Sequence, residues 1–286
     1  MLKKIIVLIT FIPLTLSAQA GKVYDNLSMK SEVLKGERKY AIYLPPDYET
    51  SERSYPVLYL LHGYGDDQAG WIQFGEVLHI ADKAIKEGKA TPMIIVMPNA
   101  DAPYRGYVNR PETDYRYEDF FINEFIPYIE KTYRIRSQKR YRAIAGLSMG
   151  GEGTFIYALH HPELFSSACP LSAATGPSNA DSLNNYYILR GIENLSKEKA
   201  QEFYNNYNVV NLINNLPAGQ LKSVRWYIDC GDDDFLTIMN SEVHIAMTKK
   251  GIPHEFRMRD GAHNWTYWRE SLPSVLKFVS DAFHQY

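Results

Sequence analysis

The sequence predicts an α/β domain with a mainly parallel central sheet and helices on both faces. Short, continuously apolar runs such as "YPVLYLLHGYG" and "MIIVMPNA" are typical of strands covered on both sides. Longer segments with helical spacing alternate with these runs along the chain. With 286 residues, of which 45% are hydrophobic, the chain is long enough to bury a large core.

The first twenty residues have the order of a secretory signal peptide. Two lysines at positions 3 and 4 precede an apolar stretch over 5–16, and "AQA" at 18–20 offers small residues for cleavage. An uncleaved anchor is the less favoured alternative, because the apolar stretch is short for a membrane span and contains Pro13. We therefore expect a secreted or periplasmic protein that begins near Gly21 and makes no stable membrane insertion.

Residues 21–286 are predicted to form one domain, since no repeat and no linker rich in Pro, Gly or Ser interrupts them. The predicted strands lie, in chain order, in "RKYAIYLPPDY", "YPVLYLLHGYG", "MIIVMPNA", "YRAIAG", "LFSSACPLSA", "VRWYIDCG" and "HEFRMRD".

Helical spacing predicts a helix from about 70 to 87, which Gly88 ends. Further helices are expected in "YEDFFINEFIPYIEKTY", where Pro127 should kink the helix, and in "IMNSEVHIAMTKKG". One more begins near Tyr267. The polar segment 175–221 has one helical piece, "SKEKAQEFYNN", and is interpreted as an inserted cap.

Charge and cysteine content narrow the possible partners. A net charge of −2, a pI of about 6.5 and the lack of a long basic block argue against nucleic acid as a partner.

Cys169 and Cys230 each lie near the end of a predicted strand, so an exported protein could join them by a disulfide. Two buried free thiols are the favoured interpretation. The sequence does not indicate the oligomeric state.

The motif Gly146-Leu147-Ser148-Met149-Gly150 lies between a predicted strand and a predicted helix. This G-x-S-x-G pattern is typical of a nucleophile elbow, in which a strained turn holds the serine clear of its own backbone. Glycines on both sides let the strand and the helix approach without a clash. A plain glycine-rich turn is the alternative, but the strand–turn–helix setting favours Ser148 as a nucleophile.

A serine nucleophile needs a base that an acid orients, and after such an elbow the chain order is serine, acid, histidine. His263 directly follows the last predicted strand, on a loop at the carboxyl ends of the strands. The other downstream histidines lie along helices, at the wrong end of a strand or at the chain end: His160, His161, His244, His254 and His284. His263 is therefore the predicted base.

The acid is expected at the end of the strand "VRWYIDCG". Asp229 lies within that strand, and Asp232, Asp233 and Asp234 follow the Gly231 turn. The residues alone do not decide among the three aspartates after the turn. Carboxylates also suit calcium, but this run lacks the interleaved spacing of a calcium loop, so no metal site is expected.

An oxyanion requires two backbone N–H donors. Met149, which follows the nucleophile, is the first. The loop His62-Gly63-Tyr64-Gly65 supplies the second, with Tyr64 N–H as the first choice and Gly65 N–H as the next.

Together these segments resemble carbohydrate esterase family one, the feruloyl and acetyl-xylan esterases, and their relative esterase D, all in the α/β-hydrolase superfamily. The resemblance covers nearly the whole mature chain, through "YPVLYLLHGYGDDQAGW", "YEDFFINEFIPYIEKTYRI", "GLSMGG", "CGDDDFL" and "GAHNWTYWRE". The family's G-x-x-D-apolar-L pattern begins at Gly231 and selects Asp234 as the acid. Its histidine falls on His263, and Ala262 stands where many relatives have a second glycine.

The resemblance implies an α/β-hydrolase fold and ester hydrolysis through an acyl-enzyme, with no metal or organic cofactor. Ser148 would attack, His263 would transfer the proton, and Asp234 would hold the imidazole. The N–H groups of Met149 and Tyr64 would hold the oxyanion.

Several aromatic residues fall near the presumed mouth of the site and could stack on a feruloyl ring or a sugar. Trp71, Trp265 and Tyr107 are the predicted substrate-binding residues, with core packing as the alternative for the tryptophans. Export argues against S-formylglutathione, so we expect a small-molecule or polysaccharide ester, in particular feruloyl esters of plant xylan. An acetyl-xylan or other carbohydrate esterase, a siderophore esterase and a catalytically inactive glycan-binding protein remain alternatives.

Overall fold

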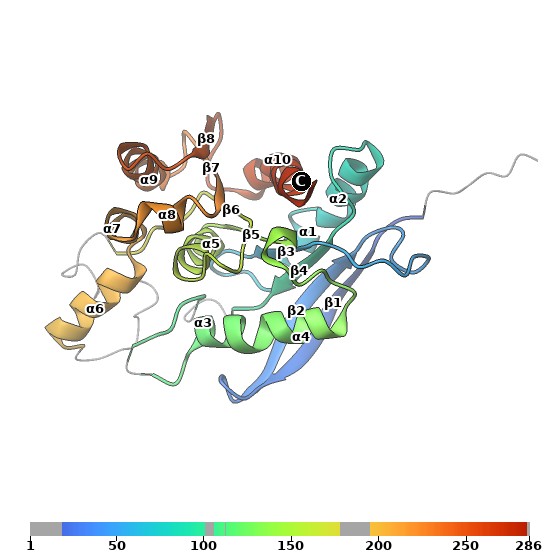
Figure 1. Ribbon diagram of the computed structural model, residues 1–286, viewed down its shortest axis with the longest axis horizontal. Coiled ribbons are helices and arrows are strands. Elements are labelled where there is room, and N and C mark those ends of the chain that lie inside the picture. The colour runs from blue at the N-terminus through green and yellow to red at the C-terminus, as the bar shows by residue number, and fades with distance from the viewer. Residues whose placement is uncertain (1–18, 101–105, 112, 178–194, 285–286) are drawn as a thin grey trace, which may run out of the picture.

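The computed structural model describes residues 19–100, 106–111, 113–177 and 195–284. Within them lies one eight-stranded sheet, in the order β1-β2-β4-β3-β5-β6-β7-β8 (Figure 1). Only the pairs β1–β2 and β2–β4 of this sheet are antiparallel, so the predicted, mainly parallel sheet is confirmed. The strands are β1 (Lys22–Ser31), β2 (Gly36–Leu44), β3 (Val57–Leu61), β4 (Ile94–Pro98), β5 (Arg142–Leu147), β6 (Ser167–Leu171), β7 (Arg225–Gly231) and β8 (His254–Arg259).

Helices connect most of the strands. They are α1 (Gly70–Gln73), α2 (Val77–Lys86), α3 (Tyr117–Phe120), the π-helix η1 (Phe121–Phe125), α4 (Ile126–Thr132), the 3₁₀-helix η2 (Lys139–Tyr141), α5 (Met149–His160), α6 (Lys197–Tyr207), α7 (Val209–Asn215), α8 (Ala218–Leu221), α9 (Thr237–Lys249) and α10 (Trp265–His284).

The helices cover both faces of the sheet, as predicted. Successive side chains of a strand point to opposite faces, so each strand serves two cores. Leu58 and Leu60 of β3 pack with residues of α1, α2 and α10 in one core. Val57, Tyr59 and Leu61 of the same strand pack with residues of α3, α4, α5 and α9 in the other. Figure 1 shows α2 and α10 side by side, with α3, α4 and α5 on the opposite side of the sheet.

The strand order places several loops at one edge of the sheet. β3 is flanked by β4 on one side and by β5 on the other, so the chain changes direction across the sheet at this point. Leu61 of β3 lies beside Gly146 of β5, and Gly231 of β7 lies beside Arg259 of β8. Because parallel strands end at a common edge, the loops after β3, β5, β7 and β8 meet there, where open α/β sheets bind ligands.

Two local predictions need correction. The strand β1 was not predicted, because its sequence shows no buried face until Met29 and Ser31. The expected helix over 70–87 is two helices, interrupted at Gly75 and Glu76. A Cβ at Gly75 would lie 2.5 Å from the Trp71 ring, and Glu76 has a left-handed φ of 52°.

The helix expected over "YEDFFINEFIPYIEKTY" changes its type near Pro127, and the expected kink there stays a prediction. The preceding turn is the π-helix η1, and Pro127 is the second residue of α4. Since proline has no N–H to donate, the wider turn accommodates the lost hydrogen bond.

The segment 175–221 contains more helix than predicted. α6 occupies the expected piece, whereas α7 and α8 were not expected; the part at 178–194 lies outside the described residues. Asn208 accepts a hydrogen bond from Asn211 N at 2.6 Å and begins α7, as helix-capping asparagines do. Val209 and Ile213 of α7 are fully buried in the core beside α5 and α9. Part of the segment therefore belongs to the helical layer of the domain.

Cys169 and Cys230 are free and buried, which confirms the favoured interpretation. The register pairs Leu171 with Asp229, so the two cysteines are three positions apart along adjacent strands. Three residues of strand span roughly 10 Å, beyond the reach of a disulfide. Among the described helices, none is both long enough and apolar enough to cross a membrane.

Candidate active site

Ser148 stands in a strained turn between β5 and α5. Its φ of 55° and ψ of −114° lie outside the regions that side-chain-bearing residues ordinarily occupy. The flanking glycines make the turn feasible. A Cβ at Gly146 would lie 2.4 Å from Gly150 O, and a Cβ at Gly150 would lie 2.6 Å from His62 O. The G-x-S-x-G pattern thus has a steric cause at both of its glycines.

A line of hydrogen bonds joins Ser148, His263 and Asp234. His263 Nδ1 lies 2.8 Å from Asp234 Oδ2 and 3.0 Å from Oδ1. Because a carboxylate can only accept, Nδ1 carries the hydrogen and the lone pair of the imidazole is on Nε2. Ser148 Oγ lies 2.9 Å from that Nε2 and donates to it. This arrangement can deprotonate the serine as it attacks an electrophilic carbon.

The environment of Asp234 keeps its carboxylate charged. Burial raises the pKa of Asp234, but hydrogen bonds from His263, from Leu236 N–H and from Ser172 outweigh burial and lower the pKa overall. Leu236 N donates to Oδ1 at 2.8 Å, and the Asp234 side chain is fully buried. An ionised acid is what an imidazole needs when it takes up a proton.

Ser172 is a residue of this site that the sequence did not indicate. Its φ is 42°, and its Oγ accepts a hydrogen bond from Trp268 Nε1 at 3.0 Å. The Trp268 ring meets the His263 ring edge-on, with centroids 4.9 Å apart. No local motif marks Ser172, because its role depends on the position of β6 between β5 and β7.

The remaining aspartates have other contacts. Asp229 is fully buried and accepts hydrogen bonds from the hydroxyls of Tyr227 and Tyr267, while Arg259 lies 3.3 Å away. It joins β7, β8 and α10 beneath the loop that carries His263.

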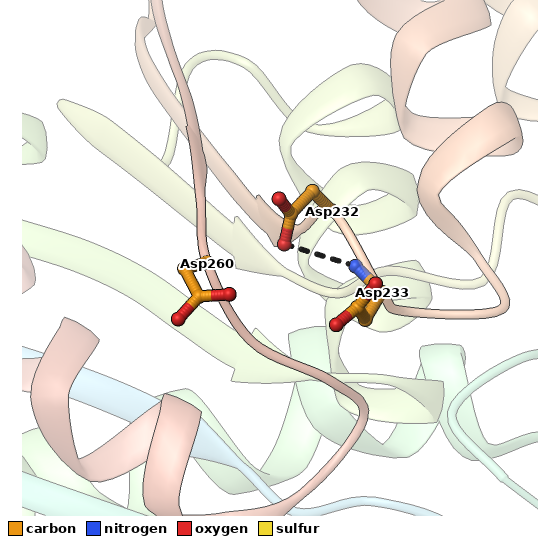
Figure 2. Close-up of side chains that lie close together, drawn as sticks. All are labelled: Asp232, Asp233 and Asp260. Carbon is orange, nitrogen blue, oxygen red and sulfur yellow. Dashed lines mark hydrogen bonds between the residues drawn. The ribbon is translucent and has the colours of Figure 1, made fainter.

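Asp232 and Asp233 lie in the neighbouring turn and form an exposed cluster with Asp260 (Figure 2). Asp232 Oδ1 accepts hydrogen bonds from Asp233 N at 3.0 Å and from Gly261 N at 3.1 Å. Its carboxylate therefore ties the turn after β7 to the loop after β8. The three carboxylates lie close enough together that they could hold a metal ion, although exposed acidic groups are common without one.

The loop after β3 lies against Ser148. A Cβ at Gly63 would lie 2.6 Å from the Leu147 side chain and 3.6 Å from Ser148 Cβ. His62 fixes this loop: its Nε2 accepts from Ala100 N at 3.0 Å, and its Nδ1 donates to Gly63 O at 2.8 Å. Tyr64 follows directly, so its backbone is placed beside the nucleophile.

The other predicted oxyanion donor is at the start of α5. Met149 is its first residue, and the first N–H groups of a helix have no acceptor within the helix. The serine and both predicted donors thus lie at the edge where β3 and β5 end.

An exposed aromatic side chain lies against the triad, and two more exposed apolar side chains are close to triad residues or the oxyanion loop in the chain. Phe235 is 75% exposed, and its ring centroid is 4.5 Å from that of His263. Ile238, one helical turn further on, is 73% exposed, and Tyr64 is 43% exposed. Such side chains beside a polar site are typical of a surface that binds an apolar ligand.

Two of the three predicted substrate-binding residues lie in the core instead. Trp71 is fully buried, and its Nε1 donates to Leu61 O at 2.9 Å. Tyr107 is 1% exposed, and its hydroxyl accepts a hydrogen bond from His62 N at 2.9 Å. Neither offers a surface to a substrate, so this prediction is wrong for both. Trp265 is half-buried, in contact with Trp71 and with the exposed Phe74, and remains a candidate.

A second acidic residue, Asp66, lies near the oxyanion loop. Its Oδ2 would be 3.6 Å from a Cβ at Gly63, the same position that approaches Ser148. Burial, and to a lesser degree the charge of Asp67, raise the pKa of Asp66 to about 6. This carboxyl group therefore changes its charge within the pH range in which an esterase works.

The histidines that were not selected as the base have structural contacts. At the end of α5, His160 Nδ1 lies 2.6 Å and His161 Nε2 3.3 Å from Glu118 of α3, to which the Tyr207 hydroxyl of α6 also donates. Burial raises the pKa of Glu118, but hydrogen bonds from both histidines outweigh it and lower the pKa to about 2. Burial lowers the pKa of His160, but Glu118 raises it overall. The cluster ties α3, α5 and α6 together.

A serine elbow after β5, an acid after β7 and a histidine after β8 on a mainly parallel sheet are the defining features of an α/β hydrolase. The Esterase family model matches residues 31–279, and the chain belongs to this family.

Relatives with similar sequences agree with this family. The chain is 37% identical to an endo-1,4-beta-xylanase/feruloyl esterase of Xylanibacter ruminicola over 244 aligned residues. The alignment covers 82% of this chain and 28% of the relative. It is 38% identical over 142 residues to an esterase of Mycobacterium tuberculosis, covering 48% of this chain and 29% of the relative. The aligned segments thus cover less than a third of the length of these curated relatives.

A solved structure of a ferulic acid esterase matches over 93% of this chain and 99% of its own, with 37% identity and a TM-score of 0.81. A fluorophosphonate-binding serine hydrolase of Staphylococcus aureus shares the fold, with a TM-score of 0.75 and 24% identity over 91% of this chain and 99% of its own. The resemblance to the feruloyl esterases and to esterase D is confirmed.

Proposed function

We propose that this esterase is exported from the cytoplasm and hydrolyses feruloyl and related hydroxycinnamoyl esters of plant cell-wall xylan, with Ser148 as its nucleophile. The hydrogen-bonded line from Ser148 through His263 to Asp234 supports the serine mechanism. The single observation that carries the substrate class is the similarity to a ferulic acid esterase over nearly the full length of both chains. Export rests on the signal-like order of the first twenty residues.

In the proposed mechanism, Ser148 Oγ attacks the ester carbonyl while His263 Nε2 takes its proton. The N–H groups of Met149 and Tyr64 bind the oxyanion, and His263 returns the proton to the leaving sugar hydroxyl. Water then attacks the acyl-enzyme by the same route and releases the acid. Asp234 holds the correct imidazole tautomer throughout.

The exposed apolar surface supports an aromatic acyl group. Phe235 lies just before α9 with its ring against His263, Ile238 is exposed on the first turn of α9, and Tyr64 is exposed next to Gly63, whose Cβ position is 3.6 Å from Ser148 Cβ. A hydroxycinnamoyl group is flat and apolar over most of its length, so it would bury these side chains on binding. An acetyl group is too small to reach more than one of them.

The test measures ferulate release from methyl ferulate by residues 21–286 beside the Ser148→Ala variant. We expect release by the parent protein and its loss in the variant. An aryl acetate serves as the second substrate. Hydrolysis of the acetate without release of ferulate would move the assignment to an acetyl esterase, and inactivity on both would favour the glycan-binding alternative.

A second variant tests the acyl surface. Phe235→Ala should raise KM for methyl ferulate about tenfold, since it removes an aromatic contact surface worth roughly 1–2 kcal/mol, and should leave kcat for the aryl acetate within about twofold. Ile245→Ala is the matched control, because Ile245 is exposed on α9 and lies ten residues beyond Phe235 in the chain, roughly three helical turns. Equal effects on both substrates would mean that Phe235 supports the imidazole rather than the acyl group.

A further inference from the structure

The carboxylate of Asp82, on α2, holds the backbone nitrogen of Gly21. Gly21 N lies 2.9 Å from Asp82 Oδ2 and 3.2 Å from Oδ1. The Tyr43 hydroxyl donates to Oδ1 at 2.7 Å. The contact joins positions 61 residues apart and attaches the start of β1 to α2.

The site accepts glycine and nothing larger. A Cβ at position 21 would lie 2.5 Å from the Tyr43 ring, 2.6 Å from Asp82 Oδ1 and 2.9 Å from Leu44 O. Any side chain would push the nitrogen away from the carboxylate, so the surroundings are fitted to this one residue.

The sequence places a cleavage signal immediately before this glycine. Ala18 and Ala20 are the small residues that a signal peptidase requires, and the side chains of Gln19 and Ala20 are exposed. Hydrolysis adds water across the Ala20–Gly21 peptide bond. Ala20 leaves with a carboxylate, and Gly21 keeps the nitrogen as an α-ammonium group.

We propose that the chain is processed between Ala20 and Gly21, and that Asp82 then forms an ion pair with the new α-ammonium group; the processing step rests on the export that is part of the proposed function. A peptide nitrogen has one hydrogen to share between the two carboxylate oxygens, whereas an ammonium has three and can serve both. The hydrogen bonds become charge-assisted, which makes them shorter and stronger. Processing thus fastens the edge strand β1 to the domain.

Four other charged groups lie near this pair: Asp47, Lys83, Lys86 and Glu87, the last paired with Lys89 at 2.7 Å. Asp47 is near Tyr43 but is paired with Arg53 at 2.6 Å. Lys83 and Lys86 line the same groove and are exposed. A free α-amino group has a pKa of about 7.7–8.0, and an ion pair with Asp82 raises it. With the carboxylate ionised, as at pH 6.5, the stabilisation is therefore complete, and it is lost as the pH rises through the raised pKa.

The experiment compares two forms of the same chain. A tag joined to Gly21 is removed by a protease that cleaves before glycine, so that the tagged form has a peptide nitrogen at Gly21 and the cleaved form has an ammonium. At pH 6.5 we expect cleavage to raise Tm by about 3 °C, as roughly one charge-assisted contact would in a domain of this size. The gain should disappear at pH 10 and in the Asp82→Asn variant. The Asp25→Asn variant, which changes an exposed carboxylate on β1, should keep it.

Two outcomes would overturn the proposal. One is an equal Tm for the cleaved and tagged forms at pH 6.5. The other is an exported protein whose first residue, determined by mass spectrometry, is not Gly21. Methyl ferulate hydrolysis by the cleaved form is measured in parallel. An inactive protein with the expected Tm pattern would contradict the proposed substrate but would still support the ion pair.

Discussion

Replacing Asp234 by asparagine should disable the enzyme through the tautomer of His263. The backbone N–H of Leu236 donates to Asp234 Oδ1, so the amide oxygen of an asparagine would take this position. The amide nitrogen would then occupy the place of Oδ2, which is 2.8 Å from His263 Nδ1. Facing a donor, Nδ1 would become the acceptor, and the hydrogen would move to Nε2. That nitrogen could no longer accept the proton of Ser148.

The structure indicates the size of the loss. Asp234 is fully buried, so water cannot replace its charge beside the imidazolium that forms during attack. Loss of the acid that sets the tautomer costs serine hydrolases about 10⁴-fold in kcat, or about 5.5 kcal/mol of transition-state stabilisation. We expect a decrease of this order for Asp234→Asn, with a small change in KM.

The assay is steady-state hydrolysis of methyl ferulate and an aryl acetate, with a thermal melt to verify that the variant is folded. Asp233→Asn is the matched control, because Asp233 is exposed and is the neighbour of Asp234 in the chain. Its kcat should stay within about twofold of the parent value, as is usual for surface substitutions. A folded Asp234→Asn variant with more than a tenth of the parent kcat, or an equally damaged Asp233→Asn variant, would refute the assignment of the acid.

Three further predictions follow from contacts described above. Glu118→Gln should lower the free energy of unfolding by about 2 kcal/mol, which is within the range for hydrogen bonds to a charged group. Thermal melts from pH 3 to 9 should show the largest loss of stability between about pH 4.5 and 6.5. Because the pKa of Glu118 is lowered in the folded protein, the contribution of Glu118 to folding stability is lost as the pH falls toward about 2. Because the pKa of His160 is raised, the contribution of His160 is lost as the pH rises above the ordinary value of this pKa. A loss of stability that is independent of pH would contradict this prediction. Gly150→Ala should cost about 3 kcal/mol in denaturant melts because its Cβ would strike two backbone carbonyls, whereas Gly219→Ala, with open space around it, should be neutral. Asp66→Asn should raise kcat/KM about fivefold at pH 8 and leave it unchanged at pH 5. Asp66 Oδ2 and Ser148 Cβ each lie 3.6 Å from the position of a Cβ at Gly63, so they are at most about 7 Å apart, and at an effective dielectric constant of ~40 a charge at that distance opposes the oxyanion by about 1 kcal/mol. An equal ratio at both pH values would exclude this effect.

The buried strands and the position of Ser148 could be predicted because both depend on local sequence. A strand covered on two faces must be apolar throughout, and a serine held between glycines directly after such a strand is typical of a nucleophile elbow. By contrast, β1 pairs on one side only and carries a mainly exposed, polar sequence, so its place in the sheet depends on β2. α7 was missed for a related reason: its asparagines have low helix propensity, and burial of Val209 and Ile213 supplies the stability.

The surroundings of the site were harder to predict than its motifs. Trp71 and Tyr107 follow glycine-rich or polar turns, as residues at a mouth would, but the sequence does not say toward which side each ring turns. Both point inward, where their polar atoms satisfy the backbone of β3 and His62. The choice of Asp234 over its neighbours needed the family pattern, because only the folded turn shows that Asp232 bonds the adjacent loop instead.

The nucleophile and its base are 115 residues apart in the chain, and the base and its acid are 29 apart. They meet only after β5, β6, β7 and β8 have paired in order, which makes the site one of the most non-local parts of the molecule. Non-local pairing is slow, because the entropy of closing long loops is lost before the contacts form. Recovery of esterase activity after dilution from denaturant should therefore lag behind the recovery of the helical circular dichroism signal. The activity can then be used to measure when the pairing of β5 to β8 is complete.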